Sequence, residues 1–125
     1  MKALLLIALF GLSTLGAQSA IPAGVYKGTW TGAQSGGDIH ITLSDGKDGK
    51  VEVGFTLDGQ EVPGKVISFK IDGTSLTLVY EFDLQGNKLQ SSTQGTLKGK
   101  TLEGTYKTTA ADTPVDEGTW KTTAQ

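Results

Sequence analysis

The fold is decided by one short phrase that occurs three times. Residues 27–31 read KGTWT, residues 103–109 read EGTYKTT and residues 117–123 read EGTWKTT. In a β-strand, the glycine and the aromatic residue two positions later point to the same face. One copy comes early in the chain and two come at its end. If the first strand pairs with the last, the chain closes on itself as a barrel.

The N-terminal residues have the pattern of a secretory signal peptide. Lys2 gives a positive start, residues 3–15 are almost all apolar, and Ala17 and Ser19 are small residues at a cleavage site. The apolar run is too short to span a bilayer comfortably, although a retained anchor is the alternative. The sequence therefore predicts a signal peptide over 1–19 and one domain over 20–125. We expect a secreted or periplasmic protein with no membrane span after cleavage.

Composition excludes several classes of protein. The chain has no cysteine, so its core relies on burial without disulfides. The eleven basic residues are all lysine, and the net charge is −2. Nucleic-acid binders need a basic face and commonly use arginine, so we expect no nucleic-acid partner. We expect a monomer.

Alternation of apolar and polar residues after residue 22, with turn residues at short intervals, predicts an all-β domain. Eight short strands joined by short turns predict antiparallel neighbours. The expected fold is an eight-stranded antiparallel up-and-down β-barrel whose first strand pairs with its last. An open sandwich is the alternative. Because the strands are short and their polar face is densely charged, the apolar face is expected inside the barrel.

Two local predictions concern the fourth strand and the last turn. Ile67, Phe69 and Ile71 are expected to face inward, after a Pro63-Gly64 pair that delays the start of the strand. Residues 110–116, which contain a proline, are expected to form the longest late loop.

The expected sixth strand has small and polar inward positions. Ser91 and Thr93 leave room for a guest and could hydrogen-bond it, opposite the rings of Tyr80, Phe82 and Tyr106. These five residues form the candidate ligand-binding site. The many large apolar residues of the inner face nevertheless favour an interior filled by side chains, in which the small residues only accommodate bulky neighbours.

Catalysis and metal binding have little support. The single histidine, His40, lies on the polar face, where only Asp38 could orient it. The segment 45–48 reads DGKD and lacks the alternating ligands of a calcium loop, so it is expected to be a turn. We therefore expect no catalytic residues, no metal site, no cofactor and no enzymatic activity.

The phrase Gly28-Thr29-Trp30, followed by an eight-strand meander, resembles the calycin-type barrels, the lipocalins and avidins, whose first strand carries Gly-x-Trp. Residues 102–106, which read LEGTY, look like an avidin strand. The arrangement is similar to small lipocalin-like domains of secreted bacterial proteins. Avidins line their pocket with several tryptophans, whereas this chain has only Trp30 and Trp120, so biotin binding is not carried over.

Two functions follow as expectations. The resemblance implies a secreted, non-catalytic barrel that binds a small apolar ligand at one mouth. The alternative is a protein-interaction or protease-inhibitor module that uses its loops or an N-terminal arm at 20–23, although such inhibitors usually carry a disulfide.

Overall fold

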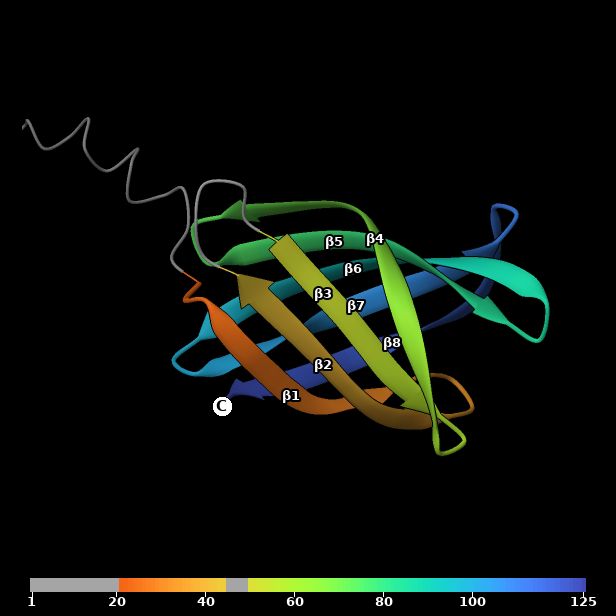
Figure 1. Cartoon of the computed structure of the whole chain (residues 1–125), viewed down its shortest axis with the longest axis horizontal. Coiled ribbons are helices and arrows are strands. Elements are labelled where there is room, and N and C mark those ends of the chain that lie inside the picture. The colour runs from red at the N-terminus through yellow and green to blue at the C-terminus, as the bar shows by residue number, and fades with distance from the viewer. Residues whose placement is uncertain (1–20, 45–49) are drawn as a thin grey trace, which may run out of the picture.

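The computed structural model describes residues 21–44 and 50–125, and these form one closed antiparallel β-barrel (Figure 1). The strands are β1 (Gly24–Thr31), β2 (Gly36–Ser44), β3 (Lys50–Leu57), β4 (Gln60–Asp72), β5 (Ser75–Leu84), β6 (Asn87–Lys98), β7 (Thr101–Ala110) and β8 (Thr113–Ala124). Each strand pairs with the next in the chain, and β8 pairs with β1. The predicted fold class is confirmed, including the pairing of first and last strands.

The three copies of the Gly-Thr-aromatic phrase lie on three adjacent strands, β1, β7 and β8. A Cβ atom on the glycine of any copy would collide with a backbone carbonyl oxygen of a neighbouring strand. The pairs are Gly28 with Lys121, Gly104 with Gln94, and Gly118 with Thr31. The glycines therefore allow neighbouring strands to approach closely, between β1 and β8 and between β6 and β7, as tightly coiled sheets require.

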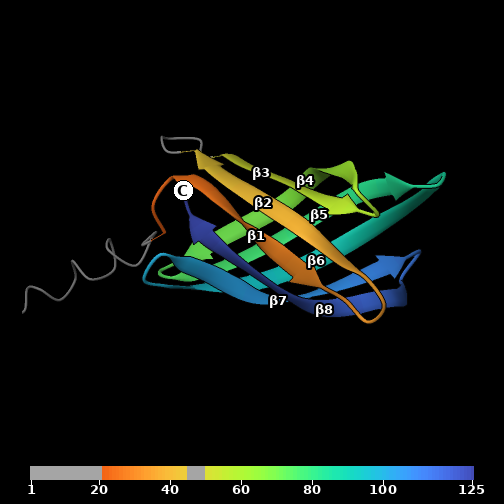
Figure 2. The same cartoon turned by 90° about the horizontal axis from the view of Figure 1, so that it is seen from below.

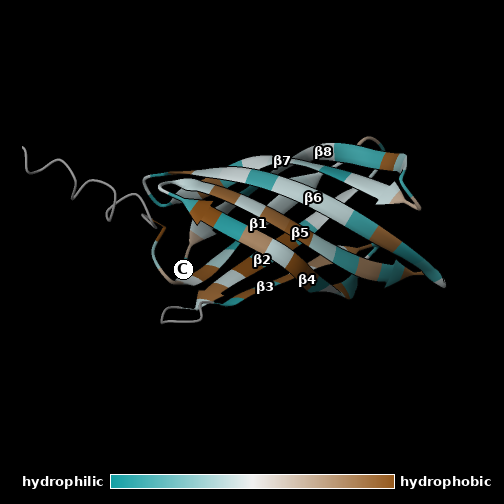
Figure 3. Ribbon diagram, turned by 90° about the horizontal axis from the view of Figure 1, so that it is seen from above, coloured by the Kyte–Doolittle hydropathy of each residue, from teal (hydrophilic) through white to brown (hydrophobic). Residues whose placement is uncertain are grey.

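The core is inside the barrel, as the alternation predicted. Apolar and polar residues alternate along the strands, which is visible in the hydropathy colouring (Figure 3), and the view from below shows the sheet wrapping round on itself (Figure 2). The side chains of Ile41, Leu78 and Leu102 have no exposed surface. At the end of the barrel that holds the C-terminus, Ile21 is also buried and the Tyr26 hydroxyl donates to the Pro22 carbonyl oxygen at 2.7 Å.

Strand β4 begins earlier than the sequence indicated. It starts at Gln60, directly after a turn at Asp58 and Gly59, and Pro63 lies within it opposite Gly54. The prediction that Pro63 delays the strand was wrong. Proline is tolerated there because pairing between β3 and β4 stops one residue later, at Gly64, so the neighbouring ladder is short.

The second half of β4 confirms the predicted inward position of Ile71, which packs against the core, but not that of Ile67. Its first part pairs with β3 and its second part with β5, so the strand turns from one neighbour to the other (Figure 1). A bulge between Val66 and Ser68 inserts Ile67 as an extra residue. Ile67 is 50% exposed, so its predicted inward orientation was wrong. Phe69 pairs opposite the buried Leu78, yet it is still 39% exposed.

The turn between β7 and β8 is also shorter than predicted. It consists of Ala111 and Asp112, both with positive φ angles, of 50° and 70°. Positive φ at both central residues is the geometry of a type I′ hairpin, whose twist matches that of the flanking strands. The expected loop over 110–116 was therefore wrong, because β8 already begins at Thr113.

Two segments lie outside the described residues. The predicted signal peptide falls within 1–20, and the expected turn around 45–48 falls within 45–49. In the part of the chain that the structure describes, no helix is long and apolar enough to cross a membrane.

Candidate ligand-binding cavity

A cavity of about 660 Å³ lies inside the barrel, at the end opposite the C-terminus. Its rim includes Ala33, Gln34 and Ser35 between β1 and β2, and Ala110 and Ala111 at the turn between β7 and β8. Buried side chains such as Ile41, Leu78 and Leu102 fill the rest of the barrel, so the expectation of a filled interior was wrong at this end only. A barrel of eight strands is wide enough to be filled or to hold one small guest, and this barrel keeps the space.

The space for this cavity is left by the small inward side chains of β6. Ser91, Thr93 and Gly95 are the inward positions of this strand, and all three are buried. Ser91 lies opposite Tyr80 of β5, and Thr93 opposite Tyr106 of β7. Each of these small residues therefore stands beside one ring, and the volume that a second large side chain would take is left open.

Aromatic rings form the apolar wall of the cavity. Trp30 packs edge-on against Phe55 and Tyr106, with ring centroids 5.9 and 6.1 Å apart, and Phe55 packs edge-on against Phe82 at 4.9 Å. Such edge-to-face pairs add to the stability that burial provides. The Trp30 indole N–H donates to the Thr56 carbonyl oxygen at 3.0 Å, so this residue presents only its ring to the cavity.

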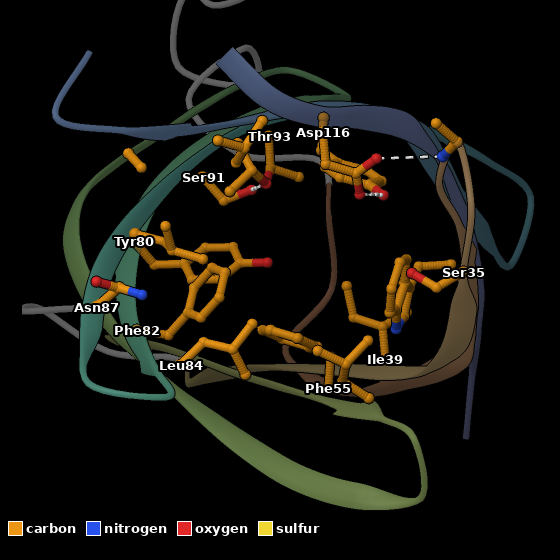
Figure 4. A pocket seen from close by; sticks show the side chains of 18 of the residues that line it. Ser35, Ile39, Phe55, Tyr80, Phe82, Leu84, Asn87, Ser91, Thr93 and Asp116 are labelled. Atoms are coloured by element: carbon orange, nitrogen blue, oxygen red, sulfur yellow. Dashed lines mark hydrogen bonds between the residues drawn. The ribbon is translucent and has the colours of Figure 1, made fainter. Parts of the chain in front are cut away.

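Hydroxyl groups form a second wall (Figure 4). Ser91 and Thr93 lie across the opening from Phe55 and Ile39. Thr108 Oγ1 donates to Ser91 Oγ at 3.3 Å, whereas Thr93 Oγ1 is buried without a well-formed hydrogen bond.

The Tyr80 hydroxyl belongs to the same wall. Burial raises the pKa of Tyr80, and the hydroxyls of Ser91 and Thr93 lower it in part. The Tyr80 hydroxyl therefore interacts with the hydroxyls of Ser91 and Thr93. Its contact with Thr93 does not meet the geometry of a hydrogen bond.

One carboxylate ties the rim together. Asp116 Oδ2 accepts the Tyr106 hydroxyl at 2.8 Å, and Asp116 Oδ1 accepts the Ala33 backbone N–H at 3.1 Å. Burial raises the pKa of Tyr106, and the hydrogen bond and negative charge of Asp116 raise it further. The Asp116 contacts join β7, β8 and the loop after β1 at the mouth.

All five residues of the predicted binding site line this one cavity: Tyr80, Phe82, Ser91, Thr93 and Tyr106. Their role in binding stays a prediction, but the fold does bring them together.

Other residues that line the cavity were not predicted from the sequence. Trp30 and Phe55 were expected only as core, and Thr108 continues the inward alternation of β7 and was overlooked. Asp116 had no signal, because it fell in an expected loop.

His40 lies elsewhere, on the outer face, and its Nε2 atom is 3.7 Å from Glu61 Oε2. It is therefore Glu61, rather than the predicted Asp38, that stands near it. Among the described residues, no three histidine or acidic side chains converge on a position where a metal ion could be held.

Comparison with known proteins gives no further guide to the site. No family model matches the chain, and neither a curated protein nor a solved structure is similar enough to count as a match. The interpretation of the cavity therefore depends on its geometry and chemistry.

Proposed function

We propose that this protein is an exported, non-catalytic barrel that binds one small apolar ligand in the cavity at its mouth. The observation that carries the proposal is the cavity itself, with a volume of about 660 Å³. Binding sites for small molecules typically occupy about 300–1,000 Å³, with mostly apolar walls and a few polar groups that orient the ligand. Here the aromatic wall provides the apolar surface, and the hydroxyl wall provides the few polar groups.

Preorganisation also supports binding. The rings of Trp30, Phe55 and Phe82 are held by contacts with one another, and the Trp30 indole is fixed by a backbone hydrogen bond. A guest would therefore meet walls already in place, and little conformational entropy would be lost on binding.

Membership of the calycin-type barrels is part of the proposal. The closed eight-strand order and the Gly28-x-Trp30 phrase in β1 support it, since both are features of lipocalin-like domains. Export rests on the N-terminal sequence pattern.

The alternative, a protein-interaction module with an N-terminal arm at 20–23, stays a prediction. Within the described part of that arm, Ile21 is buried in the core and Pro22 accepts the Tyr26 hydroxyl. These contacts hold the segment against the barrel and give the arm no geometric support as an inhibitory element.

Native mass spectrometry of the protein purified from the exported fraction tests the proposal, alongside titration with a neutral apolar dye such as N-phenylnaphthylamine. We expect a bound small molecule that is lost on denaturation, or dye binding with one site per chain. If no small molecule is bound and the dye does not bind either, the proposal is overturned.

A matched pair of variants locates the site. Ser91→Leu places a larger apolar side chain in the cavity, whereas Ser92→Leu makes the same change on the exposed outer face of the same strand. Ser91→Leu should abolish binding and Ser92→Leu should leave it intact, with the fold of both confirmed by circular dichroism. Equal binding by the two folded variants would place the ligand elsewhere.

A further inference from the structure

The hydroxyl wall has unused hydrogen-bonding capacity in a buried position. Ser91 and Thr93 are each 1% exposed. Ser91 Oγ is hydrogen-bonded to Thr108 Oγ1, whereas Thr93 Oγ1 has no well-formed hydrogen bond. Tyr80 lines the same cavity as Ser91 and Thr93, and its hydroxyl interacts with both of theirs. Buried polar groups in folded proteins nearly always have partners, so an unpartnered hydroxyl that lines a cavity marks a position where a guest can supply the hydrogen bond.

The charges that line the cavity restrict what this guest can be. Among the described lining residues, the ionisable groups other than tyrosines are Lys88 and Asp116. The Lys88 ammonium is exposed at the rim and stands 3.8 Å from Glu81, while Asp116 is held by Tyr106 and Ala33. Among the described residues that line the cavity, no cation other than the rim residue Lys88 is present to balance a charge at the hydroxyl wall. An anionic group placed there would lose its hydration without a counter-charge and would be repelled by Asp116.

We infer that the ligand of this cavity is an uncharged molecule whose apolar body carries one carbonyl oxygen, accepted into the wall formed by Tyr80, Ser91 and Thr93. The inference rests on the proposed function and adds the chemical class of the ligand. A carbonyl oxygen has two lone pairs and can accept from two of these hydroxyls, while the aromatic wall covers the apolar body. Among the described residues the Thr93 hydroxyl has no well-formed acceptor for its hydrogen, and a carbonyl oxygen on the guest would supply one.

Three probes of the same ring size test the inference: naphthalene, methyl naphthyl ketone and the naphthoate anion. Their affinities are measured by quenching of the Trp30 and Trp120 fluorescence and by calorimetry. We expect the ketone to bind about tenfold more tightly than naphthalene, the effect of one net hydrogen bond, and naphthoate to bind at least about tenfold more weakly than the ketone at neutral pH. Naphthoate binding as tightly as the ketone would overturn the inference.

Two buried threonines supply the variants. Thr93→Val removes the unpartnered hydroxyl with almost no change in shape, and the preference for the ketone over naphthalene should fall to about onefold or twofold. Thr122→Val is the control, because Thr122 is equally buried but donates to the Leu102 carbonyl oxygen away from the cavity. This control should keep the tenfold preference.

The outcomes separate the two proposals. If none of the three probes binds, the proposed function fails and the inference fails with it. If naphthalene binds but the ketone binds no better, or if Thr93→Val keeps the ketone preference, the barrel binds apolar ligands and only the carbonyl inference is wrong.

Discussion

Trp30 and Trp120 stand directly opposite each other across the β1–β8 pairing that closes the barrel, and both rings line the cavity. The Trp120 indole N–H donates to the Thr105 carbonyl oxygen at 3.2 Å, as Trp30 does to Thr56. The first and last copies of the repeated phrase therefore serve two purposes. Their glycines allow β1 and β8 to pair closely, and their tryptophan rings line the cavity inside the closed barrel.

The seam can be tested by adding a single methyl group. In Gly28→Ala, the new Cβ would collide with the Lys121 backbone carbonyl of β8, which cannot move without loss of the β1–β8 pairing. We expect the free energy of unfolding to fall by about 4 kcal/mol or more, or the chain not to fold. Urea denaturation followed by circular dichroism measures the change.

Gly95→Ala is the matched comparison. Its Cβ would lie 2.5 Å from Trp120 Cζ2, a side-chain atom that can shift, so the cost should be about 1–3 kcal/mol. If Gly28→Ala is as stable as Gly95→Ala, backbone contact at the seam is not what the phrase provides.

The unpartnered hydroxyl of Thr93 predicts a substitution that stabilises the ligand-free protein. Thr93→Val removes a buried group that lacks a hydrogen bond, and the free energy of unfolding should rise by about 1 kcal/mol. Thr122→Val breaks the 2.8 Å hydrogen bond to the Leu102 carbonyl oxygen and should lower it by about 0.5–1.5 kcal/mol. Opposite signs in urea denaturation are the expected result, and destabilisation of both variants by the same amount would contradict it.

The rim contact predicts a variant that releases ligand faster. Asp116→Ala removes both the acceptor of the Tyr106 hydroxyl and that of the Ala33 N–H, so the loop after β1 loses its link to β8. We expect the dissociation rate of a bound dye to rise several-fold in stopped-flow displacement, with a loss of stability of about 1–3 kcal/mol. Tyr106→Phe, which breaks only one of the two bonds, should give a smaller change in rate. An unchanged dissociation rate in Asp116→Ala would mean that the rim does not control exit.

The sequence predicted the strand order, the closure and the inward positions of β6, because each depends on local alternation that the barrel preserves. It failed where one extra residue changes the alternation. The bulge at Ile67 reverses the face of the residues around it, and no residue type in that stretch marks a bulge. The cavity was also unpredictable in volume, because the count of large residues does not say whether their rings point to the centre or pack along the wall.

The bulge itself predicts unequal effects of two substitutions in apolar residues on neighbouring strands. Ile67→Thr changes a half-exposed side chain and should shift the free energy of unfolding by less than about 0.5 kcal/mol. Leu78→Ala removes a fully buried side chain and should cost about 2–5 kcal/mol. Similar costs in thermal denaturation would show that Ile67 faces the core after all.

The tyrosines predict how stability depends on pH in alkaline solution. Burial raises the pKa of Tyr26, Tyr80 and Tyr106 above the ordinary value of 10.0, and Asp116 adds to the shift at Tyr106. Above pH 10, phenols of the unfolded chain lose protons that the folded protein retains, so the unfolded state binds fewer protons and the free energy of unfolding must fall as pH rises. We expect full stability with respect to these groups below pH 10 and a progressive loss above it. Phenolate absorbance should therefore appear at higher pH in the folded protein than in urea, and identical titration midpoints in the two conditions would contradict the burial of the three hydroxyls.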